Sequence, residues 1–170
     1  MLTFQQAREI AAAEISKQWP NDDSLLIIDD LTIDKEYAWI FQYTSKRYWE
    51  TKDITFAPGG NSPLFVSKMN GKISSYRTGL SLDEMINEYE EENKIWNLIL
   101  TDDVYGDTKK MSFLRKVLDL QLDKISDFKT NTAIIISSGA KTRLSSIQKR
   151  LGSKNIRTGL YQRNVKDKTK

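Results

Sequence analysis

Residues 59–77 read GGNSPLFVSKMNGKISSYR, and this stretch decides the fold of the first half of the chain. The Asn70-Gly71 dipeptide favours a two-residue type I′ turn between antiparallel strands, which would pair Phe65 with Tyr76. The glycines and proline before the strand predict a shaped loop, with Asn61 hydrogen-bonded to nearby backbone. The other face of the hairpin should be core, because its apolar residues alternate with period two: Leu64, Val66 and Ile73.

Outward from this hairpin, the pattern predicts an antiparallel sheet with flanking helices. A capping box at Thr3 precedes an apolar stripe, which predicts a helix over residues 4–17. A second capping box at Ser81 begins another helix, which ends in the solvated run Glu90-Glu91-Glu92. Short segments rich in branched and aromatic residues predict the strands: 25–29, 36–44, 47–50, 63–68 and 72–77.

Aromatic residues gather on these predicted strands. Those at positions 37, 39, 41 and 43 alternate and fall on one face, which suits either a core or a contact surface. Trp49 lies on the next predicted strand, and Trp and Tyr are enriched at protein interfaces. We therefore select candidate partner-binding residues, of which the aromatic ones act as anchors only where they are exposed: Trp39, Phe41, Trp49, Asn61, Phe65 and Tyr76.

This half of the sequence resembles a known family. The resemblance is carried by the first helix, segments 25–30, 37–43 and 60–66, and the Asn70-Gly71 hairpin, all in the same order. Together they resemble the YrhB-like immunity-protein domain (immunity protein 35 family) over about residues 2–92. Ala38 stands where the family usually has Gly. Members are predicted to protect bacteria by binding polymorphic toxins, so the resemblance implies a cognate protein toxin as partner.

Charge also divides along the chain. Residues 1–93 carry 9 Lys+Arg against 16 Asp+Glu, whereas residues 94–170 carry 17 against 7. This segregation predicts two units with unlike surfaces. We expect an acidic domain over 1–93, a basic domain over 94–164 and a disordered tail over 165–170. An acidic sheet with exposed aromatic residues would suit a basic protein partner.

The basic half predicts a second α+β unit in the order βααβαβ, with strands over 96–100, 133–137 and 156–162 and helices over 111–118, 122–128 and 144–151. This order and segment 120–128 resemble the C-terminal domain of the bacterial ribosomal stalk protein over about residues 95–162. The start of the unit is similar to the ClpS adaptor, which shares that fold. The resemblance implies the fold alone, because Ser126 replaces the stalk protein's factor-binding lysine and the chain has no His for the adaptor's peptide pocket.

Six basic residues gather on or just after the last helix of this half, opposite its apolar face. They are Lys141, Arg143, Lys149, Arg150, Lys154 and Arg157. Three interpretations stay open: a solvated helix face, a surface for an acidic protein, or a phosphate-binding patch for nucleic acid.

Composition excludes most catalytic chemistry. With 0 Cys and 0 His, the chain has no thiol nucleophile, imidazole base or Cys/His zinc site. Carboxylate pairs remain at Asp22-Asp23, Asp29-Asp30 and Asp102-Asp103, but adjacent strand residues point to opposite faces. We therefore expect no enzyme, metal site or cofactor. No apolar run approaches the roughly 20 residues that span a bilayer, so we expect no membrane contact and a cytoplasmic location.

These observations give a leading hypothesis and alternatives from other classes. The first is an immunity protein that neutralises a cognate bacterial toxin by occluding its active site or substrate access. The second is an RNA- or ribosome-associated protein that acts through the basic domain. A third is a small adaptor that recognises unfolded clients through its aromatic face.

Overall fold

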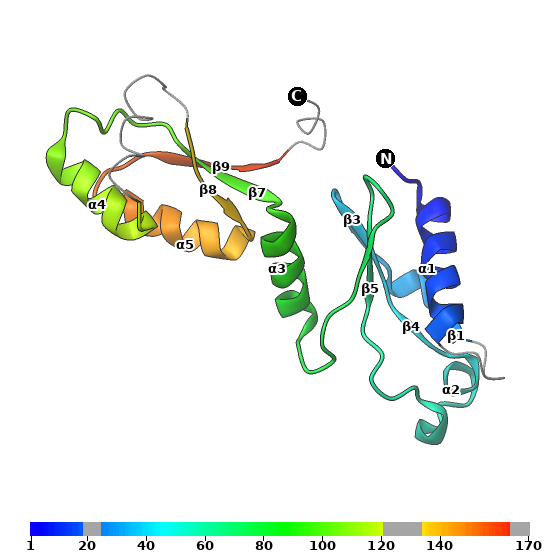
Figure 1. Cartoon of the computed structure of the whole chain (residues 1–170). Helices are drawn as coiled ribbons and strands as arrows, with labels where there is room; N and C mark the ends of the chain where they lie inside the picture. The colour runs from blue at the N-terminus through cyan, green and yellow to red at the C-terminus, as the bar shows by residue number, and fades with distance from the viewer. Residues whose placement is uncertain (19–24, 121–133, 164–170) are drawn as a thin grey trace. The chain divides into compact units, whose positions relative to one another are not determined.

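The structure, a computed structural model, describes residues 1–18, 25–120 and 134–163 (Figure 1). The chain divides into two compact units, residues 1–85 and 86–170. Both combine helices with antiparallel strands, so the α+β prediction is confirmed. The division at 85/86 falls before the predicted boundary at 93/94, because helix α3 (Leu82–Asn93) spans the division and its residues 86–93 belong to the second unit.

The first unit contains a four-stranded antiparallel sheet in the order β2-β3-β5-β6 and a two-stranded sheet of β1 with β4. The first sheet comprises β2 (Ile33–Lys35), β3 (Ala38–Phe41), β5 (Leu64–Ser67) and β6 (Ile73–Ser74). The second comprises β1 (Leu25–Ile27) and β4 (Tyr43–Ser45). The helices are α1 (Phe4–Gln18), α2 (Lys46–Thr51) and the short 3₁₀ turns η1 (Asp29–Leu31) and η2 (Ile54–Phe56).

Helix α1 packs along one face of β3 and β5, as Figure 1 shows. Small residues at helical spacing, Ala7 and Ala11, are buried against the sheet and let the helix approach closely. The predicted core face of the hairpin is confirmed, because Leu64 and Val66 belong to this cluster and Ile73 packs against it.

The hairpin register differs from the prediction. Phe65 pairs with Ser74, and a five-residue connection, 68–72, joins the strands. Of the Asn70-Gly71 dipeptide, Gly71 alone has a positive φ, +70°, whereas a type I′ turn needs positive φ at both positions. The Asn70 side chain instead accepts a hydrogen bond from the Lys72 N–H at 3.1 Å. The shift is an even number of residues, so each side chain keeps its predicted face.

Two further strand predictions were wrong. Segment 36–44 is interrupted at Gln42, which separates β3 from β4. Segment 47–50 is helix α2 and not a strand, because the Ser45 hydroxyl accepts the Tyr48 N–H at 2.9 Å and caps the helix. The capping serine overrides the β-propensity of the aromatic residues that follow it.

The second unit contains a three-stranded antiparallel sheet in the order β8-β7-β9, with helices α4 and α5 on one side of it (Figure 1). Its elements are β7 (Trp96–Leu100), α4 (Thr108–Leu118), β8 (Ile134–Gly139), α5 (Lys141–Gly152) and β9 (Thr158–Gln162). Their order agrees with the predicted βααβαβ pattern. The second predicted helix, 122–128, and the predicted tail lie outside the described residues.

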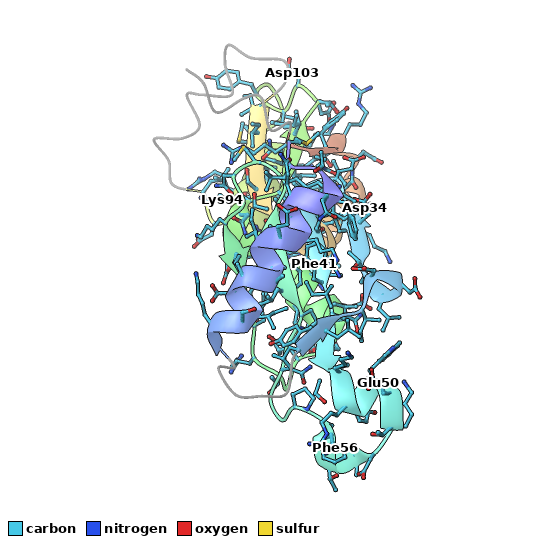
Figure 2. The ribbon with its side chains drawn as sticks, turned by 90° about the vertical axis from the view of Figure 1, so that its right-hand side faces the viewer. Asp34, Phe41, Glu50, Phe56, Lys94 and Asp103 are labelled. Atoms are coloured by element: carbon cyan, nitrogen blue, oxygen red, sulfur yellow. The ribbon has the colours of Figure 1, made fainter. Side chains whose placement is uncertain are left out.

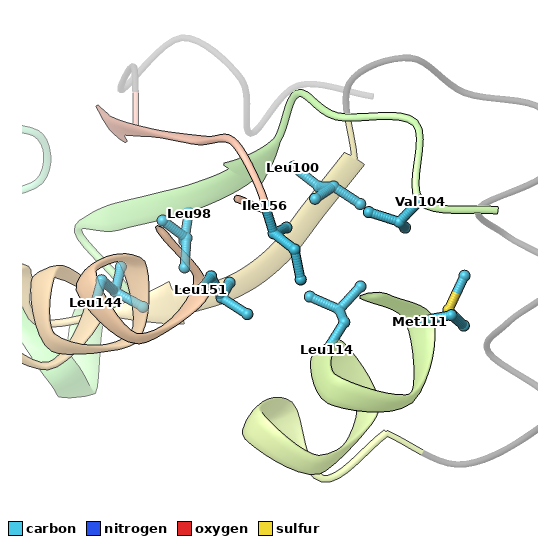
Figure 3. Packing of buried hydrophobic residues seen from close by; sticks show 8 residues of the cluster. All are labelled: Leu98, Leu100, Val104, Met111, Leu114, Leu144, Leu151 and Ile156. Atoms are coloured by element: carbon cyan, nitrogen blue, oxygen red, sulfur yellow. The ribbon is translucent and has the colours of Figure 1, made fainter. Parts of the chain in front are cut away.

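The core of the second unit lies between this sheet and its two helices (Figure 3). Leu114 of α4 and Leu144 and Leu151 of α5 are fully buried against Leu98 of β7. Each was expected from the helical or alternating spacing of apolar residues. The two helices therefore turn their polar faces outward, where the lysines and arginines of this unit lie.

Candidate partner-binding surface

The first unit presents exposed apolar side chains on a segment that we call the α2–η2 lobe, residues 46–56. Neither α2 nor η2 buries any residue. Trp49 is 40% exposed and Ile54 is 74% exposed. Figure 2 shows Glu50 and Phe56 on this lobe, away from the buried Phe41. The lobe thus displays large apolar groups without contributing a buried residue to the fold.

Specific hydrogen bonds fix the shape of the lobe. The Ser45 hydroxyl caps α2 and also donates to the Phe56 carbonyl at 2.6 Å, which ties the two ends together. The Asp53 carboxylate accepts the Thr55 N–H at 2.9 Å and the Thr55 hydroxyl at 2.8 Å, and these bonds lower the pKa of Asp53. The apolar groups are therefore presented on an ordered segment.

Cations lie over the aromatic rings of the lobe. The Arg47 guanidinium is 3.8 Å from the Phe56 ring centroid, and the Lys52 ammonium is 3.8 Å from the centroid of a Trp49 ring. The lobe has three basic residues against two acidic ones, although the first unit as a whole has 9 Lys+Arg against 12 Asp+Glu. The α2–η2 lobe therefore carries a slight excess of positive charge, although the first unit as a whole is acidic.

Burial separates the predicted anchors from one another. Phe41 and Phe65 are 0% exposed, so they do not meet the condition of exposure set for an anchor, and they fill the interior on either face of the sheet. Trp39 is partly buried, with its ring in an edge contact 5.3 Å from Phe4. Tyr76 is also partly buried and packs edge-on against Phe65 at 5.2 Å. Trp49 alone of the predicted aromatic residues is classed as exposed.

Asn61 shapes the loop that enters β5. Its side-chain amide donates to the Tyr43 carbonyl at 2.7 Å, so it connects this loop to the end of β4. A bond to backbone was predicted within the loop, but the backbone partner belongs to β4, 18 residues earlier in the chain. Ile54 was missed by sequence reasoning, since an isolated isoleucine between polar residues carries no periodic signal.

Half of the predicted basic patch is engaged in contacts within the second unit. Arg143 pairs with Glu91 at 2.9 Å and donates to the Ser138 carbonyl, and Arg157 pairs with Asp102 at 3.2 Å. Lys141 lies over the Trp96 ring at 4.6 Å. In the described ranges, Lys149, Arg150 and Lys154 form no ion pair, and the first two lie on the exposed face of α5. The six residues thus do not act as one free cationic surface.

The run Glu90-Glu91-Glu92 is structural and not merely solvated, contrary to prediction. Glu90 accepts the Lys141 N–H at 2.9 Å, and Glu91 accepts the Ala140 N–H at 2.8 Å. Ala140 supplies no side-chain cap to α5, so these carboxylates from α3 satisfy the open end of that helix. Burial alone raises the pKa of Glu91, but hydrogen bonds from Arg143 and Ala140 outweigh burial and lower the pKa.

The carboxylate pairs show no convergence on a substrate site where the structure describes them. Asp29 pairs with Arg8 at 2.8 Å, and Asp102 receives Lys110 at 2.9 Å as well as Arg157. Asp22-Asp23 lies outside the described residues. No group of three potential metal ligands occurs among the described residues, and no helix in those ranges is long and apolar enough to cross a bilayer.

No protein-family model, curated protein or solved structure matches the chain. The immunity-family and stalk-like resemblances therefore stay predictions.

Proposed function

We propose that this chain is a binding protein of the immunity class, which neutralises a cognate toxin by covering its active site or its substrate entrance. The contact surface is the α2–η2 lobe of the first unit. One observation carries the proposal: an ordered segment that buries nothing of its own exposes Trp49 and Ile54.

Exposed apolar groups on an ordered segment favour protein binding for an energetic reason. Burying a large apolar side chain that is exposed to water stabilises a complex by roughly 1.5–3 kcal/mol, and a partner surface can provide that burial. Trp is enriched among the residues that dominate interface energies. The hydrogen bonds at Ser45 and Asp53 already fix the lobe, so less conformational freedom is lost on association.

The charges of the lobe indicate the chemistry of its partner. Lys46, Arg47 and Lys52 surround the exposed tryptophan and isoleucine, while Glu50 is 3.8 Å from Lys46. A partner surface with an apolar centre and acidic rim complements this arrangement, and complementary charge mainly accelerates association. The expected toxin surface is therefore acidic around its apolar contact, and not basic as the overall charge of the half suggested.

Protection and co-purification test this proposal with the toxin encoded beside the gene. The wild-type protein should co-elute with that toxin and restore growth of cells that express it. Trp49→Ala combined with Ile54→Ser should abolish both effects. Met69→Ser is the matched control, because Met69 is 39% exposed on the same unit outside the lobe. Equal protection by the wild type and the lobe double variant would reject the lobe as the contact surface.

A further inference from the structure

A cationic cleft lies on the second unit and includes one residue of the predicted basic patch, Lys154, together with lysines of α4 that the sequence analysis did not select. It is a hollow of about 700 Å³ between α4 and the turn that follows α5. Lys109, Phe113 and Lys116 are spaced i, i+4 and i+7, which places them on one stripe of α4. Lys154 and Asn155 line the cleft from the turn.

The cleft has an excess of positive charge. Among the described residues that line it, the one carboxylate is Asp107, the N-cap of α4, which accepts the Lys109 and Lys110 N–H groups, each at 3.0 Å. Lys110 is paired with Asp102. Lys109, Lys116 and Lys154 form no ion pair with any described residue. Three ammonium groups around one hollow repel one another, and an anion bound there relieves that repulsion.

An aromatic ring lies among these lysines. Phe113 is partly buried, lines the cleft, and has the Lys154 ammonium 6.0 Å from its ring centroid. Lys109 and Lys116 are about 10 Å apart along the helix axis, from the rise of 1.5 Å per residue. This spacing suits two phosphates that flank a base over the ring better than one isolated anion. Proteins that bind single-stranded nucleic acid without sequence preference combine basic residues for the phosphates with aromatic side chains on which the bases stack.

We propose that this cleft binds single-stranded nucleic acid, with Lys109, Lys116 and Lys154 contacting phosphates and Phe113 providing a stacking surface. The site is separate from the α2–η2 lobe, and its test needs no toxin. It shares only Lys154 with the predicted patch, whose Arg143 and Arg157 are held in internal ion pairs.

A titration of the full chain with a labelled single-stranded oligonucleotide tests the site, with a mononucleotide and polyglutamate as comparison ligands. The cleft variant is Lys109→Gln with Lys116→Gln. Its control is Lys149→Gln with Arg150→Gln, which removes the same charge from the exposed face of α5. Thermal unfolding of both variants shows whether each retains its fold. Phe113→Leu tests the ring while preserving an apolar side chain.

The oligonucleotide should bind the wild type at low salt, with an affinity that falls as salt rises. The cleft variant should lose at least tenfold more affinity than the control, and its salt slope should shrink by about 0.7 for each lost phosphate contact. Phe113→Leu should weaken binding by about tenfold with an unchanged salt slope. Equal losses in cleft and control variants, or no binding at low salt, would overturn the proposal. An affinity for polyglutamate equal to that for the oligonucleotide would overturn the proposal and indicate an acidic protein as the ligand. Binding of the mononucleotide without the oligonucleotide would also overturn it and indicate a nucleotide site.

Discussion

At the scale of single residues, Gly139 shows how one missing side chain permits a capping arrangement. Its φ is +153°, and a Cβ built there would lie 2.2 Å from Glu91 Oε2 and 2.4 Å from an Arg143 guanidinium nitrogen. Those two groups form the ion pair that orients Glu91 toward the Ala140 N–H. The glycine therefore leaves the space in which the α5 cap is assembled.

Gly139→Ala should destabilise the second unit by about 1–3 kcal/mol, because it strains the backbone and displaces the Glu91 carboxylate. Chemical denaturation with tryptophan fluorescence measures the change. Gly152→Ala is the control, since a Cβ there meets no atom within 4 Å and alanine favours the helix. If both substitutions leave the unfolding midpoint unchanged, the packing around Gly139 described above is incorrect.

Asp102 is a second residue whose effect can be isolated, here by pH. The Lys110 hydrogen bond is the main cause that lowers the pKa of Asp102 below its ordinary value of 3.8, and Arg157 adds to it. A depressed folded-state pKa means that the carboxylate stabilises the fold above the ordinary pKa. That contribution is lost as pH falls through the lowered pKa.

Asp102→Asn should therefore cost about 1 kcal/mol near pH 7, a small value because Arg157 is 78% exposed to solvent. The difference in unfolding free energy between wild type and variant should shrink below about pH 4 and vanish once the wild-type carboxylate is protonated. Urea midpoints across this pH range provide the measurement. A difference that stays constant with pH would show that the ion pairs contribute nothing.

At the scale of elements, the lobe and the sheet differ in what their aromatic residues do. Phe41 fills the core, whereas α2 and η2 bury no residue. Phe41→Ala should thus cost about 3–5 kcal/mol, as large-to-small core substitutions do. Trp49→Ala should cost less than about 1 kcal/mol, mainly through the lost contact with Lys52.

Thermal and chemical unfolding of these two variants compare their stabilities directly. Ile54→Ser should also leave the unfolding midpoint near that of the wild type, because its side chain is largely in water. A loss for Trp49→Ala comparable with that for Phe41→Ala would mean that the lobe supports the fold, and its exposed groups would then need no partner.

Much of the element order could be predicted from local signals. The Thr3 capping box, the alternation at Leu64 and Val66, and the helical spacing of Leu144 and Leu151 each predict an element that the structure contains. Two of the element predictions that were wrong concern segments in which a side chain forms a hydrogen bond with the local backbone. The Ser45 cap turned a β-prone segment into α2, and the Asn70 side chain changed the hairpin turn.

The candidate site was predicted less well than the fold, because exposure cannot be obtained from residue type. Alternation left open whether the face of Phe41 is core or contact surface and placed Phe65 on the face opposite Leu64 and Val66, but both phenylalanines proved to be buried. Trp49 was named for its aromatic character and is exposed on a helix that the sequence did not predict. The stripe of Lys109 and Lys116 was not predicted, because the expected helix, 111–118, began after Lys109, and the cleft also depends on the distant turn at Lys154.

At the scale of the whole molecule, the boundary between units has a structural cause. Glu90 and Glu91 cap α5, so the second half of α3 belongs to the second unit. Including it changes the charge of that unit to 17 Lys+Arg against 11 Asp+Glu. The segregation of charge is therefore weaker than the division at 93/94 suggested, because these glutamates neutralise part of the unit to which they belong.

Two fragments test this boundary. The fragment 86–170 retains both capping carboxylates and should be more stable than 94–170, by at least about 1–3 kcal/mol for the lost charged hydrogen bonds. Circular dichroism during thermal unfolding compares them. Adding Glu90→Gln and Glu91→Gln to the longer fragment should remove most of its advantage. Equal melting of the two fragments would place the boundary at 93/94.

The central claim is that the α2–η2 lobe is the surface that contacts a partner protein. Amide hydrogen exchange of the full chain, measured with and without the toxin encoded beside its gene, tests that claim most directly. The account predicts that exchange slows over residues 46–56 when the toxin is added, while the amides of the α4 cleft keep their rates. Slowed exchange that omits residues 46–56 would contradict it.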